Sequence, residues 1–168
     1  MSDSPLLVRP SAPDARGKIH SITPQSANWR YVGFAVHLLK AGQSLVLDGG
    51  ANELCLVLVA GVATMRVGGH DFGRLGERMS PFAGKPWALY APKGSQITVA
   101  AQSDLELAVC SSPGGGDVSP RVIAPDDSRQ LRRGEGTNRR YPYNILPEDD
   151  PAHSLLVVEV ITPGGHWS

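Results

Sequence analysis

The chain has 168 residues, enough for one well-buried domain and too few for two of ordinary size. Its 16 basic residues balance 16 acidic ones, so the net charge excludes a general electrostatic attraction to nucleic acid or to an anionic membrane. Glycine (19 residues) and proline (14 residues) are frequent and helical periodicity is scarce, which predicts an all-β chain of short strands and turns.

The first residues are polar and acidic, whereas a secretory signal would be basic and then apolar. No apolar run approaches the ~18 residues that a membrane-spanning helix requires. We therefore expect a cytoplasmic protein with no membrane partner.

Short apolar runs separated by turn residues follow one another through the first two thirds of the chain. Turn residues recur roughly every 8–12 positions, a spacing that favours a β-sandwich or barrel over alternating strands and helices. The expected strands cover residues 18–23, 31–39, 44–48, 53–59, 62–67, 87–91, 96–101 and 105–110.

Cys55 and Cys110 each lie inside an apolar run, and neither has a second cysteine or a histidine at metal-ligand spacing. We expect buried free thiols rather than a disulfide. The histidines are equally scattered. We expect His166, which follows two glycines, to be a turn residue outside any metal site. Four others lack a nearby partner ligand and are expected on the surface: His20, His37, His70 and His153.

The composition changes after residue 110. Residues 111–153 are rich in serine, proline and glycine and then in arginine, which predicts a polar connector between two β regions. An apolar strand over 155–160 leads into the turn Pro163-Gly164-Gly165, after which another strand should follow. We therefore expect residues 154–168 to be the first strand and turn of a second β unit that the chain does not complete.

Arginine and tyrosine side chains are concentrated in this connector. They suggest a nucleic-acid patch, but the zero net charge and the acidic residues 148–150 favour an internally salt-bridged linker without a nucleic-acid partner. A third interpretation is that Arg133 or Arg139 binds a carboxylate, because a guanidinium matches it with two parallel hydrogen bonds. The residues concerned are Arg132, Arg133, Arg139, Arg140, Tyr141 and Tyr143.

Several turn residues resemble those of the cupin family. Gly42 opens a hairpin, Glu53 leads an apolar strand to Gly61, and a later segment reads Pro92-Lys93-Gly94-Ser95-Gln96-Ile97. In cupins, two histidines and a glutamate of the first motif and a histidine of the second converge on one metal inside a jelly-roll barrel. The resemblance implies such a barrel over residues 1–110.

The metal-ligand positions of the cupin motifs hold other residues in this chain. Asp48 and Gly50 stand where the histidines would be, Glu53 is one residue early relative to Gly61, and Ile97 replaces the second-motif histidine. We therefore expect a barrel without a metal. Glu53 could be a leftover ligand, but we expect it to make a turn hydrogen bond at its strand start.

A narrower resemblance is to the N-terminal half of 5-deoxyglucuronate isomerase, a double cupin of inositol catabolism. It implies conversion of 5-deoxyglucuronate to 2-deoxy-5-ketogluconate and, in the full-length family, a divalent metal whose ligands follow the position matching Ser168. This chain is then expected to be inactive alone, and its catalytic residues stay unassigned. The matching segments are residues 29–34, 53–58, 108–110, 133–139 and 154–168.

The sequence is therefore consistent with two functions. One is the metal-free part of a sugar isomerase. The other is a non-enzymatic cupin module that binds a small sugar acid or serves in dimer assembly. In either case an open strand end exposes unpaired edges and apolar surface, so we expect a homo-oligomer.

Overall fold

The computed structural model describes residues 7–167 and is built almost entirely from β-strands. Within this range, no helix is long and apolar enough to cross a membrane. In chain order the elements are β1 (Lys18–Ile22), α1 (Pro24–Ala27), β2 (Gly33–Leu39), β3 (Ser44–Asp48), β4 (Asn52–Ala60), β5 (Ala63–Val67), β6 (His70–Leu75), β7 (Trp87–Ala91), β8 (Gln96–Ala101), β9 (Leu105–Pro113), β10 (Arg121–Ile123), β11 (Arg129–Gln130), η1 (Gly136–Asn138), β12 (Tyr141–Leu146) and β13 (Val157–Ile161).

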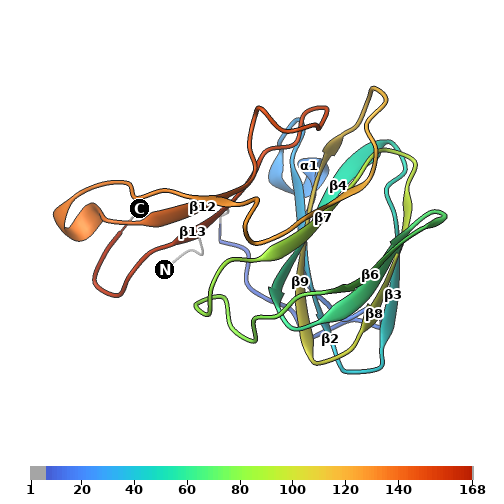
Figure 1. Cartoon of the computed structure of the whole chain (residues 1–168), viewed down its shortest axis with the longest axis horizontal. Helices are drawn as coiled ribbons and strands as arrows, with labels where there is room; N and C mark the ends of the chain where they lie inside the picture. The colour runs from blue at the N-terminus through green and yellow to red at the C-terminus, as the bar shows by residue number, and fades with distance from the viewer. Residues whose placement is uncertain (1–6, 168) are drawn as a thin grey trace.

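Two antiparallel sheets face each other and form a barrel (Figure 1). The six-stranded sheet has the order β1-β2-β9-β4-β7-β10, and the four-stranded sheet has the order β3-β8-β5-β6. Strands far apart in the sequence are neighbours in both sheets, as in the double Greek key of a jelly roll. The all-β cupin jelly roll predicted from the sequence is confirmed.

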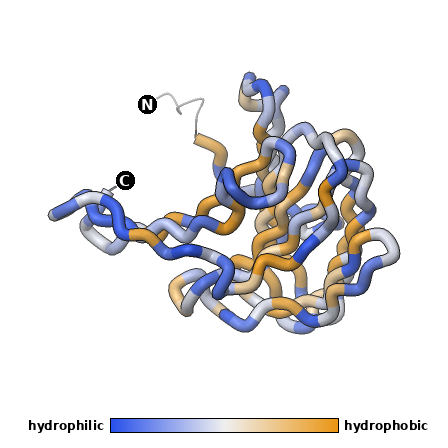
Figure 2. Tube along the Cα trace, turned by 45° about the horizontal axis from the view of Figure 1, so that its top comes forward, coloured by the Kyte–Doolittle hydropathy of each residue, from blue (hydrophilic) through white to orange (hydrophobic). Residues whose placement is uncertain are grey.

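Side-chain alternation places one row of each strand inside the barrel. On β4 the inward row is Leu54, Leu56 and Leu58, and on β9 it includes Leu107 and Val109, all of them buried. Burying one such side chain contributes about 1.5–3 kcal/mol, so these rows account for much of the stability of the barrel. Figure 2 shows the apolar segments concentrated in the barrel.

Residues 111–153, expected to be a polar connector, contain three strands. β10 extends the six-stranded sheet, while β11 and β12 join β13 in a three-stranded sheet that projects from the barrel (Figure 1). We call residues 129–167 the arm. Its strands are short, and the pairing of β12 with β13 could not be inferred from local composition. A second barrel beginning at β13 stays a prediction.

The base of the arm packs on the outer face of the six-stranded sheet. Cys55 and Tyr90 from the barrel and Leu146 and Val157 from the arm belong to this second buried cluster. Cys55 is fully buried and lies opposite the half-buried Cys110 on β9, and both thiols are free, as predicted. Burial raises the pKa of the Cys110 thiol to about 11, so this thiol is a poor nucleophile at neutral pH.

Candidate functional site

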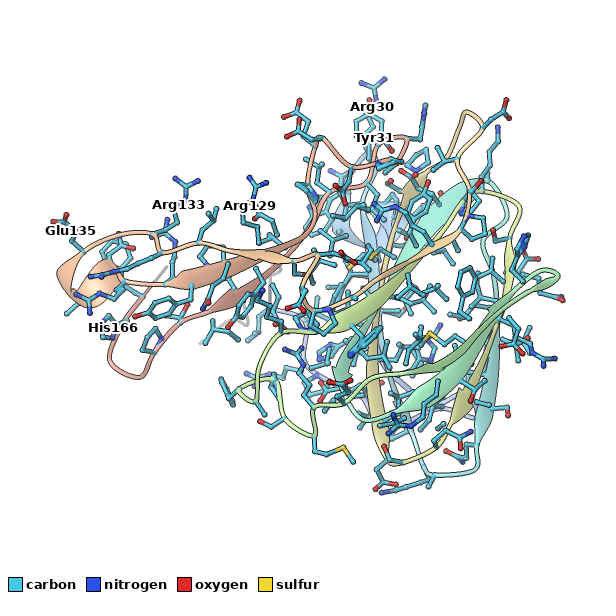
Figure 3. The ribbon with its side chains drawn as sticks, viewed as in Figure 1. Arg30, Tyr31, Arg129, Arg133, Glu135 and His166 are labelled. Atoms are coloured by element: carbon cyan, nitrogen blue, oxygen red, sulfur yellow. The ribbon has the colours of Figure 1, made fainter. Side chains whose placement is uncertain are left out.

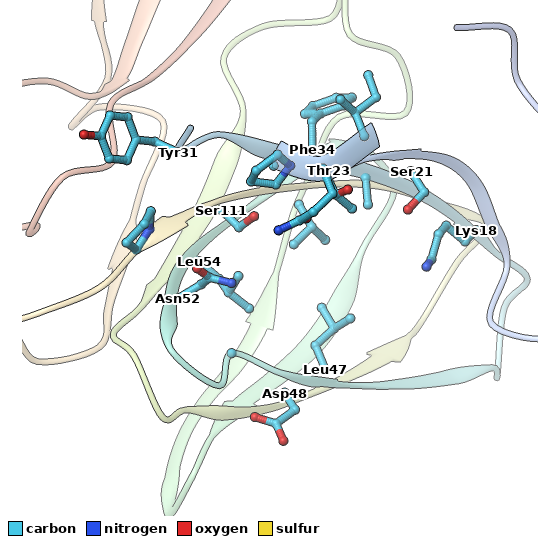
Figure 4. Close-up of a pocket in the computed structure, with 18 of the residues that line it drawn as sticks. Lys18, Ser21, Thr23, Tyr31, Phe34, Leu47, Asp48, Asn52, Leu54 and Ser111 are labelled. Carbon is cyan, nitrogen blue, oxygen red and sulfur yellow. The ribbon is translucent and has the colours of Figure 1, made fainter. Parts of the chain in front are cut away.

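A cavity of about 540 Å³ opens at one mouth of the barrel, beside α1 and the starts of β2 and β4. Its floor is apolar and includes Leu47, Leu54 and Val109, and its rim is polar. Figure 4 shows Lys18 on one side of the cavity, with Asn52 and Ser111 on the other. We call this space the mouth cavity.

The inward rows of β4 and β9 become polar at this mouth. On β4 the inward row ends in Asn52, one step beyond Leu54, and on β9 it ends in Ser111, one step beyond Val109. Gly33, paired with Ser111, leaves the space that the Ser111 hydroxyl occupies, because an added Cβ would lie 2.5 Å from that oxygen. The sequence therefore forms a closed apolar interior and an open polar end.

The charged groups of the mouth cavity are unevenly distributed. Lys18 is half-buried on β1, whereas Arg30 and Asp48 are exposed. The Arg30 guanidinium lies 5.1 Å from the centre of the Tyr31 ring, in cation–π contact. The Asp48 carboxylate accepts a hydrogen bond from the backbone N–H of Gly50 at 2.9 Å. Two cations and one carboxylate favour an anionic ligand.

The cupin metal positions do not fit a metal in this barrel. Leu54, which follows Glu53 and so stands at the spacing of the cupin glutamate, and Ile97 occupy two of the four positions, and both are buried in the inner apolar cluster. Among residues 7–167, no group of three or more His, Cys, Asp or Glu side chains is placed to hold a metal ion. The remaining positions, Asp48 and Gly50, offer a single exposed carboxylate, which would bind a cation weakly.

Glu53 has neither of the roles expected from the sequence. As the neighbour of Leu54 it points to the opposite face of β4, away from the barrel interior, where it is completely buried. Its carboxylate accepts hydrogen bonds from the Tyr90 hydroxyl (2.6 Å), the Ser112 hydroxyl (3.1 Å) and the backbone N–H groups of His153 (2.8 Å), Ser154 (2.6 Å) and Leu155 (2.7 Å). Glu53 therefore fixes the arm to the barrel.

The Glu53 carboxylate is held in its ionised form. Burial opposes ionisation, but the hydrogen bonds from Tyr90 and from three backbone N–H groups outweigh it, and they keep the pKa of Glu53 below its ordinary value. The same contact raises the pKa of Tyr90, whose hydroxyl is buried and donates to the carboxylate.

Two ion pairs also connect the barrel to the arm. Arg78 is buried and donates to both carboxylate oxygens of Glu159, at 2.9 and 2.5 Å. Arg121 donates to Asp150 at 2.9 Å. In the part of the chain that the structure describes, the expected salt-bridged linker is found only in the Arg121–Asp150 pair, which lies inside residues 111–153. For Arg132, Arg133, Arg139 and Arg140 the expectation is wrong, since none of them has an acidic partner within residues 7–167. The partners of Glu159 and Asp150 instead come from distant parts of the chain.

Arg133 and Arg139, the predicted carboxylate ligands, lie on the arm and do not line the mouth cavity. Figure 3 shows Arg133 pointing away from the arm on the same side as Arg129. Arg133 is exposed and Arg139 is half-buried. The structure therefore does not bring them together with the cavity, and their role stays a prediction.

His20, His70 and His153 are at least partly exposed, as expected, but His37 is not. This residue is 1% exposed and lies on the inward row of β2, where its Nδ1 is 3.0 Å from the carbonyl oxygen of Arg16. The turn that precedes β1 covers it, a contact that local sequence could not reveal. His166 lies in a turn, with its N–H donating to the carbonyl oxygen of Pro163 at 3.0 Å.

Sequence reasoning missed Lys18, Asn52 and Ser111, the polar residues of the mouth cavity. The available signal was the change from apolar to polar along the inward rows of β4 and β9. Recognising it requires knowing which end of each strand lies at the mouth.

A 5-deoxy-glucuronate isomerase from Geobacillus thermodenitrificans (strain NG80-2) is 42% identical over 166 residues, which cover 98% of this chain and 61% of the relative. One from Bacillus subtilis (strain 168) is 36% identical over 152 residues, covering 89% and 56%. The crystal structure of an IolB-like protein from Salmonella typhimurium LT2 is similar with a TM-score of 0.87 and 47% identity, covering 91% of this chain and 59% of that one.

The chain thus spans about three-fifths of the length of the relatives it matches, 61% for the Geobacillus thermodenitrificans protein. The profile of the KduI/IolB family matches residues 6–168, nearly the whole chain. This chain therefore belongs to the KduI/IolB family.

Proposed function

We propose that the chain is the N-terminal part of a sugar isomerase that acts on 5-deoxyglucuronate, and that this segment has no isomerase activity alone. The observation that carries the proposal is the match of 98% of the chain to 61% of a 5-deoxy-glucuronate isomerase. The apolar side chains at the cupin metal positions, Leu54 and Ile97, support the second half of the proposal.

The chemistry explains why a metal-free barrel would be inactive. Isomerisation of an aldose to a ketose moves a proton between adjacent carbons, which needs a base and an electrophile near neighbouring oxygens. Among residues 7–167, no histidine lines the mouth cavity, and the one carboxylate that does, Asp48, is exposed. We propose that the divalent metal and the catalytic groups belong to the portion of the relatives that this chain does not match.

The test is an isomerase assay of the 168-residue chain with 5-deoxyglucuronate, with and without added divalent metals. We expect no turnover and no stoichiometric metal by elemental analysis. The full-length Geobacillus thermodenitrificans relative serves as the positive control under the same conditions. Stoichiometric metal together with turnover in the short chain would contradict the proposal.

We also propose a cytoplasmic role in inositol catabolism, as the resemblance of the sequence to 5-deoxyglucuronate isomerase implies. A carboxylate contact by Arg133 or Arg139 remains part of this proposal. Its test is titration of a sugar acid against the unmodified chain and Arg139→Ala, for which equal affinity would refute the contact by Arg139.

A second candidate is a non-enzymatic module for assembly as a homodimer. The observation that favours it is a row of exposed apolar side chains on and beside β13, Leu156 (64% exposed), Val158 (54%) and Val160 (43%). Exposed apolar rows on an edge strand favour pairing with another chain. β13 is the edge strand of the arm sheet. Light scattering after size exclusion tests the idea, and a monomer at micromolar concentration would refute it.

A further inference from the structure

We propose that the mouth cavity binds a small polyhydroxylated carboxylate, such as a sugar acid, with Lys18 contacting the carboxylate and Asn52 and Ser111 contacting hydroxyl groups. The proposal rests on the proposed function, which it deepens by naming a binding site in the metal-free barrel. It is carried by the shape of the cavity, its charge and its unpaired polar groups.

The size and the floor of the cavity suit a monosaccharide. Its volume of about 540 Å³ lies within the range of about 300–1,000 Å³ typical of small-molecule sites. Leu47, Leu54 and Val109 form an apolar floor. A sugar ring has apolar C–H faces and a polar edge, so one face can pack on this floor while the edge meets the rim.

Lys18 provides the cation for a carboxylate. Its side chain lines the cavity, and its ammonium group makes no hydrogen bond and no ion pair to any residue in the range 7–167. Lys18 is half-buried on β1, so a bound carboxylate would be partly shielded from water. This shielding would strengthen its contact with the ammonium group. Arg30, on the same rim, adds a second positive charge.

Asn52 and Ser111 provide partners for hydroxyl groups. A carboxamide both donates and accepts, and a serine hydroxyl does the same, so each can match a sugar hydroxyl in either orientation. Neither side chain has a hydrogen-bond partner within the described part of the chain, and both face the cavity from neighbouring strands, β4 and β9. Their equivalents deeper in the barrel are leucine and valine, so these polar groups are confined to the mouth.

Gly33 keeps the Ser111 hydroxyl accessible. An added Cβ at this position would lie 2.5 Å from the Ser111 oxygen and 3.5 Å from the carbonyl oxygen of Ile22. A Cβ atom and a hydroxyl oxygen cannot lie 2.5 Å apart, so Gly33→Ala would displace the Ser111 hydroxyl. This substitution therefore changes the site without removing any of its polar groups.

The first test is an NMR titration of the ¹⁵N-labelled chain with D-glucuronate and, separately, with D-glucose. We expect D-glucuronate to shift the amide signals of Lys18, Asn52 and Ser111 in a saturable manner. D-glucose should bind at least about 10-fold more weakly, because a charged hydrogen bond contributes roughly 1.4 kcal/mol more than a neutral one. Equal affinity for the two sugars, or shifts confined to the arm, would overturn the proposal.

Variants then separate the roles of the residues. Lys18→Met should weaken D-glucuronate binding about 10-fold and leave D-glucose binding nearly unchanged. Asn52→Leu and Gly33→Ala should weaken both. The matched control is Lys40→Met, which removes an exposed lysine that does not line the mouth cavity and whose ion pair with Asp104 contributes little. Wild-type affinity in Lys18→Met, in a variant whose amide spectrum is otherwise unchanged, would refute the assignment.

The binding test and the isomerase test fail independently. If the chain binds D-glucuronate at the mouth cavity but the family activity is found to require no second part, the site stands and the proposed function fails. If no sugar acid binds while the short chain stays inactive, the site is refuted and the proposed function is untouched.

Discussion

Replacing Glu53 by glutamine should destabilise the protein more than any exposed carboxylate substitution. The side chain keeps its size, but one of its two acceptor oxygens becomes an NH₂ donor. That donor would face N–H and O–H groups which now point at a carboxylate. Because Glu53 is fully buried, water cannot satisfy the mismatched groups.

The magnitude follows from the individual contacts. If the amide NH₂ takes the place of Oε2, the His153 N–H, now 2.8 Å away, loses its acceptor, at a cost of about 1–3 kcal/mol. The N–H groups of Ser154 and Leu155, at 2.6 and 2.7 Å, exchange a charged acceptor for a neutral one, which costs about 1 kcal/mol each. After the smaller desolvation cost of the amide is subtracted, we expect a loss of about 3 kcal/mol.

Urea unfolding followed by circular dichroism measures this loss. A change of about 3 kcal/mol corresponds to a fall in Tm of roughly 6–12 °C for a chain of this size. Amide hydrogen exchange at 153–155 should also accelerate, because these groups detach with the arm. The control is Glu77→Gln, an exposed position. A loss below about 0.5 kcal/mol for Glu53→Gln would refute the role of Glu53 as the arm's anchor.

The stabilisation by Glu53 should also depend on pH. Its pKa is lower in the folded state than the ordinary 4.5, so the folded state holds the proton more weakly than the unfolded chain does. The contribution is therefore complete above about pH 4.5 and is lost as the pH falls through the folded-state pKa. In a plot of the free energy of unfolding against pH, Glu53→Gln should lose less stability at acid pH than the unmodified chain does. The same acid dependence in both proteins would contradict this account.

Three further perturbations have defined outcomes. Arg78→Met leaves the carboxylate of Glu159 without its buried partner and should cost about 3 kcal/mol in urea unfolding, with no loss contradicting a tight ion pair. Gly61→Ala forces a φ of 104° on alanine and places a Cβ 2.3 Å from a carbonyl oxygen, so Tm should fall, whereas Gly69→Ala, which meets open space, should leave it nearly unchanged. Desolvation lowers the pKa of His37 below 6.5, so the free energy of unfolding should decrease as the pH falls through that value, and His37→Gln should lack this decrease if the cause is correct.

Most strands of the barrel were predictable because the signals that define them are local, but β6 (His70–Leu75) lies outside the expected ranges. Alternation of apolar and polar side chains, and glycine or proline at turns, mark strands such as β4 and β8 without knowledge of their neighbours. β11 has only two residues, and β10 three, which is too short for any alternation to be recognised. These strands exist because β7 and β12 offer pairing partners.

By itself, the sequence determined the all-β fold, the family resemblance and the replacement of the cupin metal ligands, because each depends on spacing along the chain. Only the tertiary structure decided what Glu53 does, since its acceptor Oε1 binds the N–H of Ser154, 101 positions away. It likewise decided which polar residues meet at the mouth cavity: Lys18, Asn52 and Ser111 come from three strands. Which strand ends share one mouth depends on the pairing of distant strands, and no local pattern contains that information.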